Sequence, residues 1–214
     1  MKKNLTEIIF LLDRSGSMAG LEPDTIGGFN SLIRKQREEE GEALISTVLF
    51  DHHTEVIHDR VPLDRVPPLT RKEYYVRGST ALLDAVGASV HHIGNVHKYA
   101  REEDRPEHTL FVITTDGMEN ASRRYDYDQV RQMIEKQKSE HGWEFLFLGA
   151  NMDAAKEAAR MGIEEDCAAD YDCDPEGMAL SYDVLAETIS KFRSDESIQP
   201  DWKTRLREKF RKET

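Results

Sequence analysis

The chain has 214 residues with 29 basic and 41 acidic side chains, so its formal net charge is −12 at pH 7. This length fits one domain, or one domain with an extension. A uniformly acidic surface argues against nucleic acid or an anionic membrane as partner, because both are polyanions. No apolar run approaches the ~20 residues of a membrane span, and the run 8–12 is too short for a secretory signal. These features predict a cytoplasmic protein with no membrane and no nucleic-acid partner.

The sequence has two cysteines, Cys167 and Cys173. A disulfide between cysteines so close in sequence would not stabilise a chain of this size, so reduced thiols are expected. A short disulfide or half of a metal site is the alternative.

Strand and helix patterns alternate along the chain. In chain order they predict strand 7–12, helix 25–40, strands 43–50 and 55–58, helix 80–99, strand 108–115, helix 126–140, strand 143–148, helix 153–161, strand 167–171 and helix 177–192. Segments 13–24, 60–79 and 101–107 are expected to be loops. Such alternation is typical of an α/β fold with a doubly wound, mostly parallel sheet and helices on both faces. The charged tail 199–214 repeats Trp202, Leu206 and Phe210 every four residues, which predicts a short docking helix.

Polar side chains gather where predicted strands end or helices begin. These candidate residues are Asp13, Ser15, Ser17, Thr80 and Asp116. In a doubly wound sheet, ligands bind outside the carboxyl ends of the strands, where the strand order reverses. Asp13 and Asp116 end the two most apolar strands, so their carboxylates meet there if those strands are neighbours.

This set of side chains offers oxygen alone, from two carboxylates and three hydroxyls. Oxygen ligands select Mg²⁺, Mn²⁺ or Ca²⁺, whereas zinc prefers cysteine or histidine. Ser15 and Ser17 are two residues apart, so their hydroxyls can point the same way on an extended loop. Thr80 begins a predicted helix, where its hydroxyl would also suit an N-cap.

The D-x-S-x-S stretch at 13–17, together with Thr80 and Asp116, resembles the metal-ion-dependent adhesion site (MIDAS) of the von Willebrand factor A (VWA) domain family. The resemblance covers about residues 5–193. Length, and the T-x-L-x-D sequence at 80–84, resemble the free-standing intracellular bacterial members. The resemblance divides the chain into a VWA-like domain, 1–195, and a charged helical extension, 196–214.

The resemblance implies a Rossmann-like, six-stranded sheet with strand order 3-2-1-4-5-6. It also implies that Ser15, Ser17 and Thr80 contact a metal, most simply Mg²⁺, while Asp13 and Asp116 act through water. One coordination position then remains for an Asp or Glu of a protein partner. In related domains the last helix, here 177–192, can shift when the metal changes ligands.

Three further residues are candidates for supporting the site. Asp84 lies one helical turn after Thr80 and is predicted to hold the Thr80 loop or a metal-bound water, although an ordinary polar helix residue is the alternative. Gly16 allows the loop between the serines to turn, and Gly117 follows Asp116 directly. Glu119 and Asn120 are candidates for the rim.

Two other patterns suggest metals but are better explained otherwise. Histidines occur in a predicted hairpin and on one predicted helix without a cysteine nearby, and we expect them to be exposed rather than zinc-binding; they are His52, His53, His58, His91, His92 and His97. The acidic run 170–175 resembles the start of a calcium loop. However, Pro175 and Ser181 replace its glycine and glutamate, so we predict an acidic cap on the next helix.

The favoured function is a metal-dependent protein-interaction module that is not an enzyme. Ser15 lacks a G-x-S-x-G elbow, no P-loop occurs, and an aspartyl phosphotransferase would need aspartate at position 15. A Mg²⁺-dependent enzyme acting on phosphate remains one alternative. A scaffold or regulatory subunit of an ATPase or kinase system, with the metal site unused, is the other.

Overall fold

A computed structural model describes the backbone of residues 1–213 and the side chains of residues 1–210. Within these residues, six strands form one sheet in the order β3-β2-β1-β4-β5-β6. Its strands are β1 (Lys2–Asp13), β2 (Glu42–Phe50), β3 (Thr54–Pro62), β4 (Pro106–Thr115), β5 (Glu144–Gly149) and β6 (Ala168–Asp170). β3 pairs antiparallel with β2, and the other pairs are parallel. The predicted fold class and strand order are confirmed.

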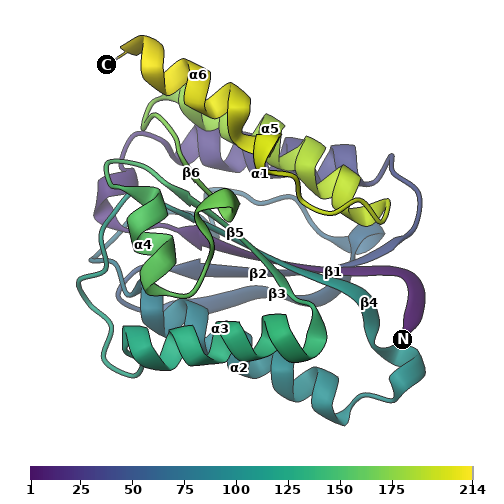
Figure 1. The fold of residues 1–214 in the computed structure, drawn as a ribbon. Helices are drawn as coiled ribbons and strands as arrows, with labels where there is room; N and C mark the ends of the chain where they lie inside the picture. Colours follow the sequence, from purple (N-terminus) through teal and green to yellow (C-terminus); the bar gives the residue numbers. More distant parts are fainter. Residues whose placement is uncertain (214) are drawn as a thin grey trace.

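Helices cover both faces of the sheet (Figure 1). One face carries α1 (Glu22–Gln36) and α5 (Pro175–Arg193), with α6 (Thr204–Glu213) packed against α5. The other face carries α2 (Leu82–Tyr99), α3 (Tyr127–His141) and α4 (Ala154–Arg160). None of the helices within residues 1–213 is both long and apolar enough to cross a membrane.

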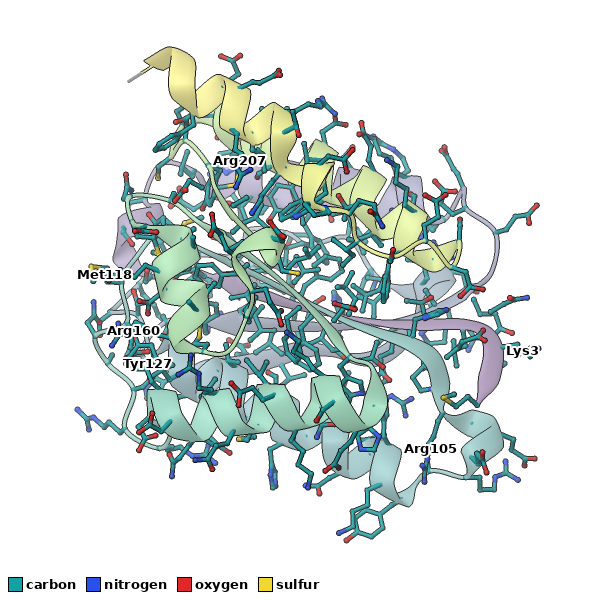
Figure 2. The ribbon with its side chains drawn as sticks, viewed as in Figure 1. Lys3, Arg105, Met118, Tyr127, Arg160 and Arg207 are labelled. Atoms are coloured by element: carbon teal, nitrogen blue, oxygen red, sulfur yellow. The ribbon has the colours of Figure 1, made fainter. Side chains whose placement is uncertain are left out.

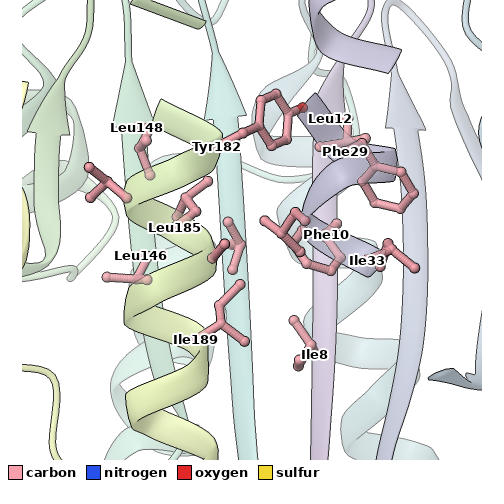
Figure 3. Packing of buried hydrophobic residues seen from close by; sticks show 14 of the residues in the cluster. Ile8, Phe10, Leu12, Phe29, Ile33, Leu146, Leu148, Tyr182, Leu185 and Ile189 are labelled. Atoms are coloured by element: carbon pink, nitrogen blue, oxygen red, sulfur yellow. The ribbon is translucent and has the colours of Figure 1, made fainter. Parts of the chain in front are cut away.

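The central strand β1 is buried on both faces. Ile8, Phe10 and Leu12 face α1 and α5, whereas Ile9 and Leu11 face the α2 and α3 layer. Because successive side chains of a strand point to opposite faces, a strand covered on both sides needs a continuous apolar run. Figure 3 shows how Phe10 meets α1 on the first of these faces.

The helices α1 and α5 approach each other closely. A Cβ at Gly28 would lie 2.2 Å from Cδ2 of Tyr182, so only a residue without a side chain fits at this point of α1. Tyr182 belongs to the same apolar layer as Leu185 and Ile189 of α5 (Figure 3). This contact fixes how α1, which directly follows the serine loop, sits on the sheet.

Several element boundaries differ from the sequence prediction. β1 begins at Lys2 instead of 7, because Lys2 N donates a hydrogen bond to Arg105 O and extends the ladder with β4. α1 begins earlier, at Glu22, and ends at Gln36. α2 begins at Leu82 with Ala81 as N-cap. Thr80 therefore precedes the helix, and the prediction that it begins the helix is wrong.

The expectation that all the histidines are exposed is wrong for His58, which is buried, and for His97, whose side chain is 13 % exposed with Nε2 2.7 Å from Glu7 Oε2. The clearest case is His58. Its ring is 6 % exposed and stacks on Phe29 at 6.5 Å between ring centroids, while Nδ1 lies 3.0 Å from Thr47 Oγ1. The cause is register, because residue 58 of β3 pairs with Thr47 of β2 and faces the core. Burial lowers the pKa of His58, so the neutral ring is favoured.

The C-terminal segment docks as a helix over the part that the structure describes; Thr214 lies outside it. Leu206 is buried at 2 % exposure, and Trp202 Nε1 donates a hydrogen bond of 2.7 Å to Asp166 O. Lys203 is also buried, and its Nζ donates to Ala168 O at 2.8 Å, which holds the short strand β6. Phe210, at 39 % exposure, is not part of the buried stripe. The division of the chain at residue 195 stays a prediction.

Replacing Leu206 with alanine should lower the free energy of unfolding by about 2–5 kcal/mol, the usual loss for a buried leucine. The matched control is Glu208→Ala on the exposed side of the same helix, which should change it by less than about 0.5 kcal/mol. Urea unfolding of both variants measures the difference. Equal stabilities would show that α6 is not docked in solution.

Candidate metal site

The predicted site residues meet at the carboxyl ends of β1 and β4. These strands are neighbours, with Leu12 paired to Thr114, so Asp13 and Asp116 leave the sheet at the same edge. The chain moves from β1 to β2 on one side and later returns to β4 on the other, so this edge is the topological switch point. Met118 marks this end of the molecule in Figure 2.

Asp13 is buried, and both of its carboxylate oxygens accept hydrogen bonds. Oδ1 accepts the Ser15 backbone N–H at 2.7 Å, and Oδ2 accepts the Thr115 hydroxyl at 2.6 Å. Burial raises the pKa of Asp13 to about 6, although the bonds from Thr115 and Ser15 oppose this rise. The negative charge of Asp116 adds to it. A carboxylate so close to another carboxylate and so poorly solvated favours a cation nearby.

Asp116 connects the carboxylates to the serines. Its Oδ1 accepts a 2.6 Å hydrogen bond from Ser17 Oγ, and Ser17 Oγ lies 3.0 Å from Ser15 Oγ. The Cys173 thiol faces the other carboxylate oxygen at 3.7 Å. Burial raises the pKa of Asp116, and the bonds from Ser17 and Cys173 oppose it. Both Cys167 and Cys173 are free thiols.

Three hydroxyls converge on one point beside Gly117. A Cβ built at Gly117 would lie 2.8 Å from Thr80 Oγ1, 3.3 Å from Ser17 Oγ and 3.8 Å from Ser15 Oγ. Within the described residues, no group of three or more His, Cys, Asp or Glu side chains is arranged to hold a metal ion, so a metal here would depend on these hydroxyls. The donor set, hydroxyls flanked by carboxylates, suits a hard cation such as Mg²⁺.

Backbone hydrogen bonds hold Thr80 in place. Thr80 N donates to Asn120 Oδ1 at 3.0 Å, and Thr80 O accepts the N–H groups of Asn120 and Ala121 at 3.0 and 3.1 Å. On the serine side, Gly16 N donates to Gly78 O at 3.1 Å. Both serine-bearing and threonine-bearing segments are therefore attached to each other and to the loop after Asp116.

Asp84 and Glu119 hold that same loop against the start of α2. The Asp84 carboxylate accepts the backbone N–H groups of residues 123, 124 and 125 at 2.8–3.0 Å. Glu119 accepts the N–H groups of Leu83 and Ala121, each at 2.9 Å. Asp84 thus supports the segment that follows Asp116, and Glu119 caps the start of α2.

A buried ion-pair cluster supports the other side of the site. Arg14 is fully buried; its Nε donates to Asp51 Oδ2 at 2.9 Å and its Nη2 lies 2.7 Å from Glu55 Oε2. Arg77 Nε donates to the same Asp51 oxygen at 2.8 Å. Burial opposes ionisation of Asp51, but the bonds from Arg77, the His53 N–H and Arg14 together lower its pKa.

Sequence reasoning missed several of these supports. Asp51 and Thr115 both carried a signal, since each lies at the end of an apolar strand at the edge where Asp13 emerges. No local sequence pattern indicated Tyr74 or Cys173. Tyr74 Oη donates to Asp13 O at 2.5 Å from a loop 61 residues away, and Cys173 reaches Asp116 from the turn before α5.

Solved structures of von Willebrand factor A domains share this fold. The vWF domain of the type V pilus tip protein Mfa5 from Porphyromonas gingivalis matches with a TM-score of 0.59 and 11 % identity, over 86 % of this chain and 94 % of that chain. A von Willebrand factor type A protein from Catenulispora acidiphila matches with a TM-score of 0.56 and 16 % identity, over 87 % of this chain and 42 % of that chain. Proximal thread matrix protein 1 from the mussel byssus, with a zinc-occupied MIDAS motif, matches with a TM-score of 0.58 and 13 % identity, over 86 % of this chain and 46 % of that chain.

The chain spans less than half the length of the mussel and Catenulispora chains. No family model matches the sequence, and neither does any curated protein. At these identities the likeness establishes the fold: the chain has the Rossmann-like architecture of a von Willebrand factor A domain.

Replacing Gly117 with alanine should weaken binding of Mg²⁺ or Mn²⁺ about tenfold or more, because the new methyl group occupies the point where the hydroxyls converge. Gly27→Ala is the control, since a Cβ there meets nothing within 4 Å and alanine favours a helix. Calorimetric metal titration and thermal unfolding separate the two effects. Unchanged metal affinity in a folded Gly117→Ala protein would exclude this point as the metal position.

The pKa of Asp13 predicts a pH dependence in the metal-free protein. The pKa is about 6 in the folded chain against an ordinary value of 3.8, so the folded state holds this proton more tightly. The free energy of unfolding therefore falls as the pH rises from about 4 to about 6, because the buried carboxylate becomes charged. The loss approaches about 3 kcal/mol. Relative to Asp13→Asn, the wild type should lose stability over this range, while its metal affinity rises.

Asparagine is a suitable comparison at position 13. Its Oδ1 can accept the Ser15 N–H and its amide can donate to Thr115 Oγ1, which keeps its own bond to Gly117 O at 3.0 Å. Urea unfolding in EDTA at a series of pH values gives the difference between the two proteins. A difference that does not change with pH would contradict the raised pKa.

Proposed function

We propose that this chain is a metal-dependent protein-interaction module. Ser15, Ser17 and Thr80 would hold Mg²⁺ directly, Asp13 and Asp116 would act through water, and an Asp or Glu of a protein partner would complete the coordination. Mn²⁺ or Ca²⁺ could use the same oxygens. The observation that carries the proposal is the convergence of three hydroxyls, from two separate segments, on one point beside Gly117.

The burial of the site supports an open position on one side. Asp13, Ser15 and Thr80 are buried, whereas Ser17 and Gly16 are exposed. A cation held largely by neutral hydroxyls keeps much of its positive charge, and a bound cation of this kind attracts a carboxylate more strongly than a neutral group does. A partner would thus approach from the side of Ser17.

The mussel byssus protein, with its zinc-occupied MIDAS motif, gives an example of a metal in a similar fold. We propose binding and not catalysis, since the donors described here are explained by holding a cation and a partner carboxylate. The proposal includes a cytoplasmic location and the intracellular bacterial type, on the sequence resemblance.

Capture of a protein partner from native cell extract in Mg²⁺ should be lost with Asp13→Ala, with Ser15→Ala and with EDTA. Ser139→Ala on the exposed side of α3 is the matched control and should retain the partner. Circular dichroism confirms that each variant folds. Capture that survives EDTA and both site variants would refute a metal-dependent interaction.

The enzyme alternative is checked on the same preparations. We expect no turnover of phosphomonoesters or nucleotides with or without Mg²⁺. Metal-dependent turnover that disappears in Asp116→Ala would replace the binding proposal by a phosphate-handling enzyme.

A further inference from the structure

The two loops beside the candidate metal site are basic, although the chain as a whole is acidic. Loops 66–81 and 117–126 together contain five basic residues and three acidic ones, against 29 and 41 for the whole chain. The basic residues are Arg71, Lys72, Arg77, Arg123 and Arg124. These two loops therefore differ in charge from the chain average, whereas the turn before α5 at the same edge carries Asp172 and Asp174.

Four of these cations form no ion pair among the described side chains, although Lys72 lies near enough to the Glu73 carboxylate to help lower its pKa. Arg71, Lys72, Arg123 and Arg124 are exposed and form none of the ion pairs found within residues 1–210, whereas Arg77 is bound to Asp51. The three acidic residues of the loops already accept hydrogen bonds from nearby backbone or hydroxyl groups. Glu73 accepts the N–H and hydroxyl of Thr70, Glu119 accepts N–H groups at the start of α2, and Asp126 caps α3.

Short connections attach the four cations to the metal site. On one side Arg14 Nη1 donates to Glu73 O at 3.2 Å and Tyr74 Oη donates to Asp13 O. Arg71 and Lys72 therefore lie within one to three residues of these contacts. On the other side Ala121 N donates to Thr80 O at 3.1 Å, two residues before Arg123. Each of the two loops thus carries two neighbouring basic residues that form no ion pair, of which Arg124 lies over the Tyr125 ring at 5.7 Å.

Each of the two basic loops also carries an exposed apolar side chain. Tyr75 is 42 % exposed, and its ring contacts the guanidinium groups of Arg14 and Arg77, each 5.2 Å from its centroid. Beside it is an open cavity of about 390 Å³ lined by Tyr74, Tyr75 and Arg71, and also by Gly20, Pro23 and Glu22, whose carboxylate accepts the Gly20 N–H. Met118 is 62 % exposed, two residues after Asp116. A rigid exposed tyrosine of this kind is a typical anchor in protein interfaces.

We propose that the partner presents an extended, multiply acidic peptide segment to this face. One carboxylate would complete the metal coordination, and acidic residues on either side of it would pair with Arg71 and Lys72 and with Arg123 and Arg124. An apolar side chain of the same segment packs on Tyr75. The inference rests on the proposed function, because the metal sets the register of the peptide.

The physical basis is charge complementarity. Unpaired cations next to a metal steer an acidic segment to this face, while the net charge of −12 repels it from the remaining surface. An extended chain advances by ~3.3–3.6 Å per residue, so carboxylates two to four positions from the central one reach several ångströms to either side.

The test compares two fluorescent peptides of equal length by anisotropy in Mg²⁺. One has a single central glutamate in a serine and glycine background; the other adds two glutamates on each side and one tyrosine. We expect the multiply acidic peptide to bind about tenfold more tightly. This advantage should shrink in high salt, since exposed charges are screened.

Charge reversal identifies the residues responsible. The double variants Arg71→Glu/Lys72→Glu and Arg123→Glu/Arg124→Glu should each lose about tenfold in affinity for the multiply acidic peptide. Lys3→Glu/Lys98→Glu makes the same change in charge and should bind like the wild type. Figure 2 shows Lys3 at the opposite end of the molecule from Met118. Calorimetric Mg²⁺ titration and thermal unfolding show that each variant keeps its metal and its fold.

The outcomes separate this inference from the function on which it rests. If EDTA abolishes binding but both peptides bind equally and charge reversal has no effect, the multiply acidic partner is refuted and the interaction module stands. If EDTA does not change peptide binding, or if no metal binds, both the multiply acidic partner and the metal-dependent interaction module are refuted. Equal binding of a single-stranded oligonucleotide, with the same loss on charge reversal, would also refute a peptide partner.

Discussion

The buried ion pair between Arg14 and Asp51 joins the segments that build the candidate metal site. Both side chains are fully buried, and Arg14 lies in sequence between Asp13 and Ser15. Removing one partner of such a pair leaves an uncompensated charge in the protein interior, at a cost of about 3–5 kcal/mol. The serine loop and the turn between β2 and β3 are therefore held together. Arg77 adds the loop before α2 to the same carboxylate.

The site takes its shape from backbone bonds as much as from side chains. Asp51 O accepts the Ala81 N–H at 2.8 Å, which places Thr80 immediately beside the ion-pair cluster. Opposite it, the carboxylates of Asp84 and Glu119 accept backbone N–H groups of the loop after Asp116. The hydroxyls are thus positioned by groups that do not themselves face the convergence point, which is how an organised binding site is kept rigid.

Average charge and local charge lead to different expectations about partners. The net charge of the chain predicts an acidic surface that repels polyanions, and that argument treats the surface as uniform. The structure brings Arg71 and Arg123, 52 positions apart in sequence, to the two flanks of one site. A sum over the chain cannot show this, because position on the surface depends on which loops emerge at the same edge of the sheet.

The sequence by itself determined the alternation of strands and helices, the α/β class, and the pairing of Asp13 and Asp116 as groups at strand ends. These follow from short-range patterns: continuous apolar runs where strands are covered on both faces, and polar residues where such runs stop. The strand order, and the division of the candidate residues into direct and water-mediated metal ligands, came from the resemblance to a family, and of these the strand order is confirmed. Only the tertiary structure decided that His58 is buried by the register of β3 and that Thr80 lies before α2. It also decided that Asp84 supports a distant loop and that Arg14, Asp51 and Tyr74 hold the serine loop. These contacts join residues far apart in the chain, and their partners are selected by packing of the sheet edge, which no local pattern encodes.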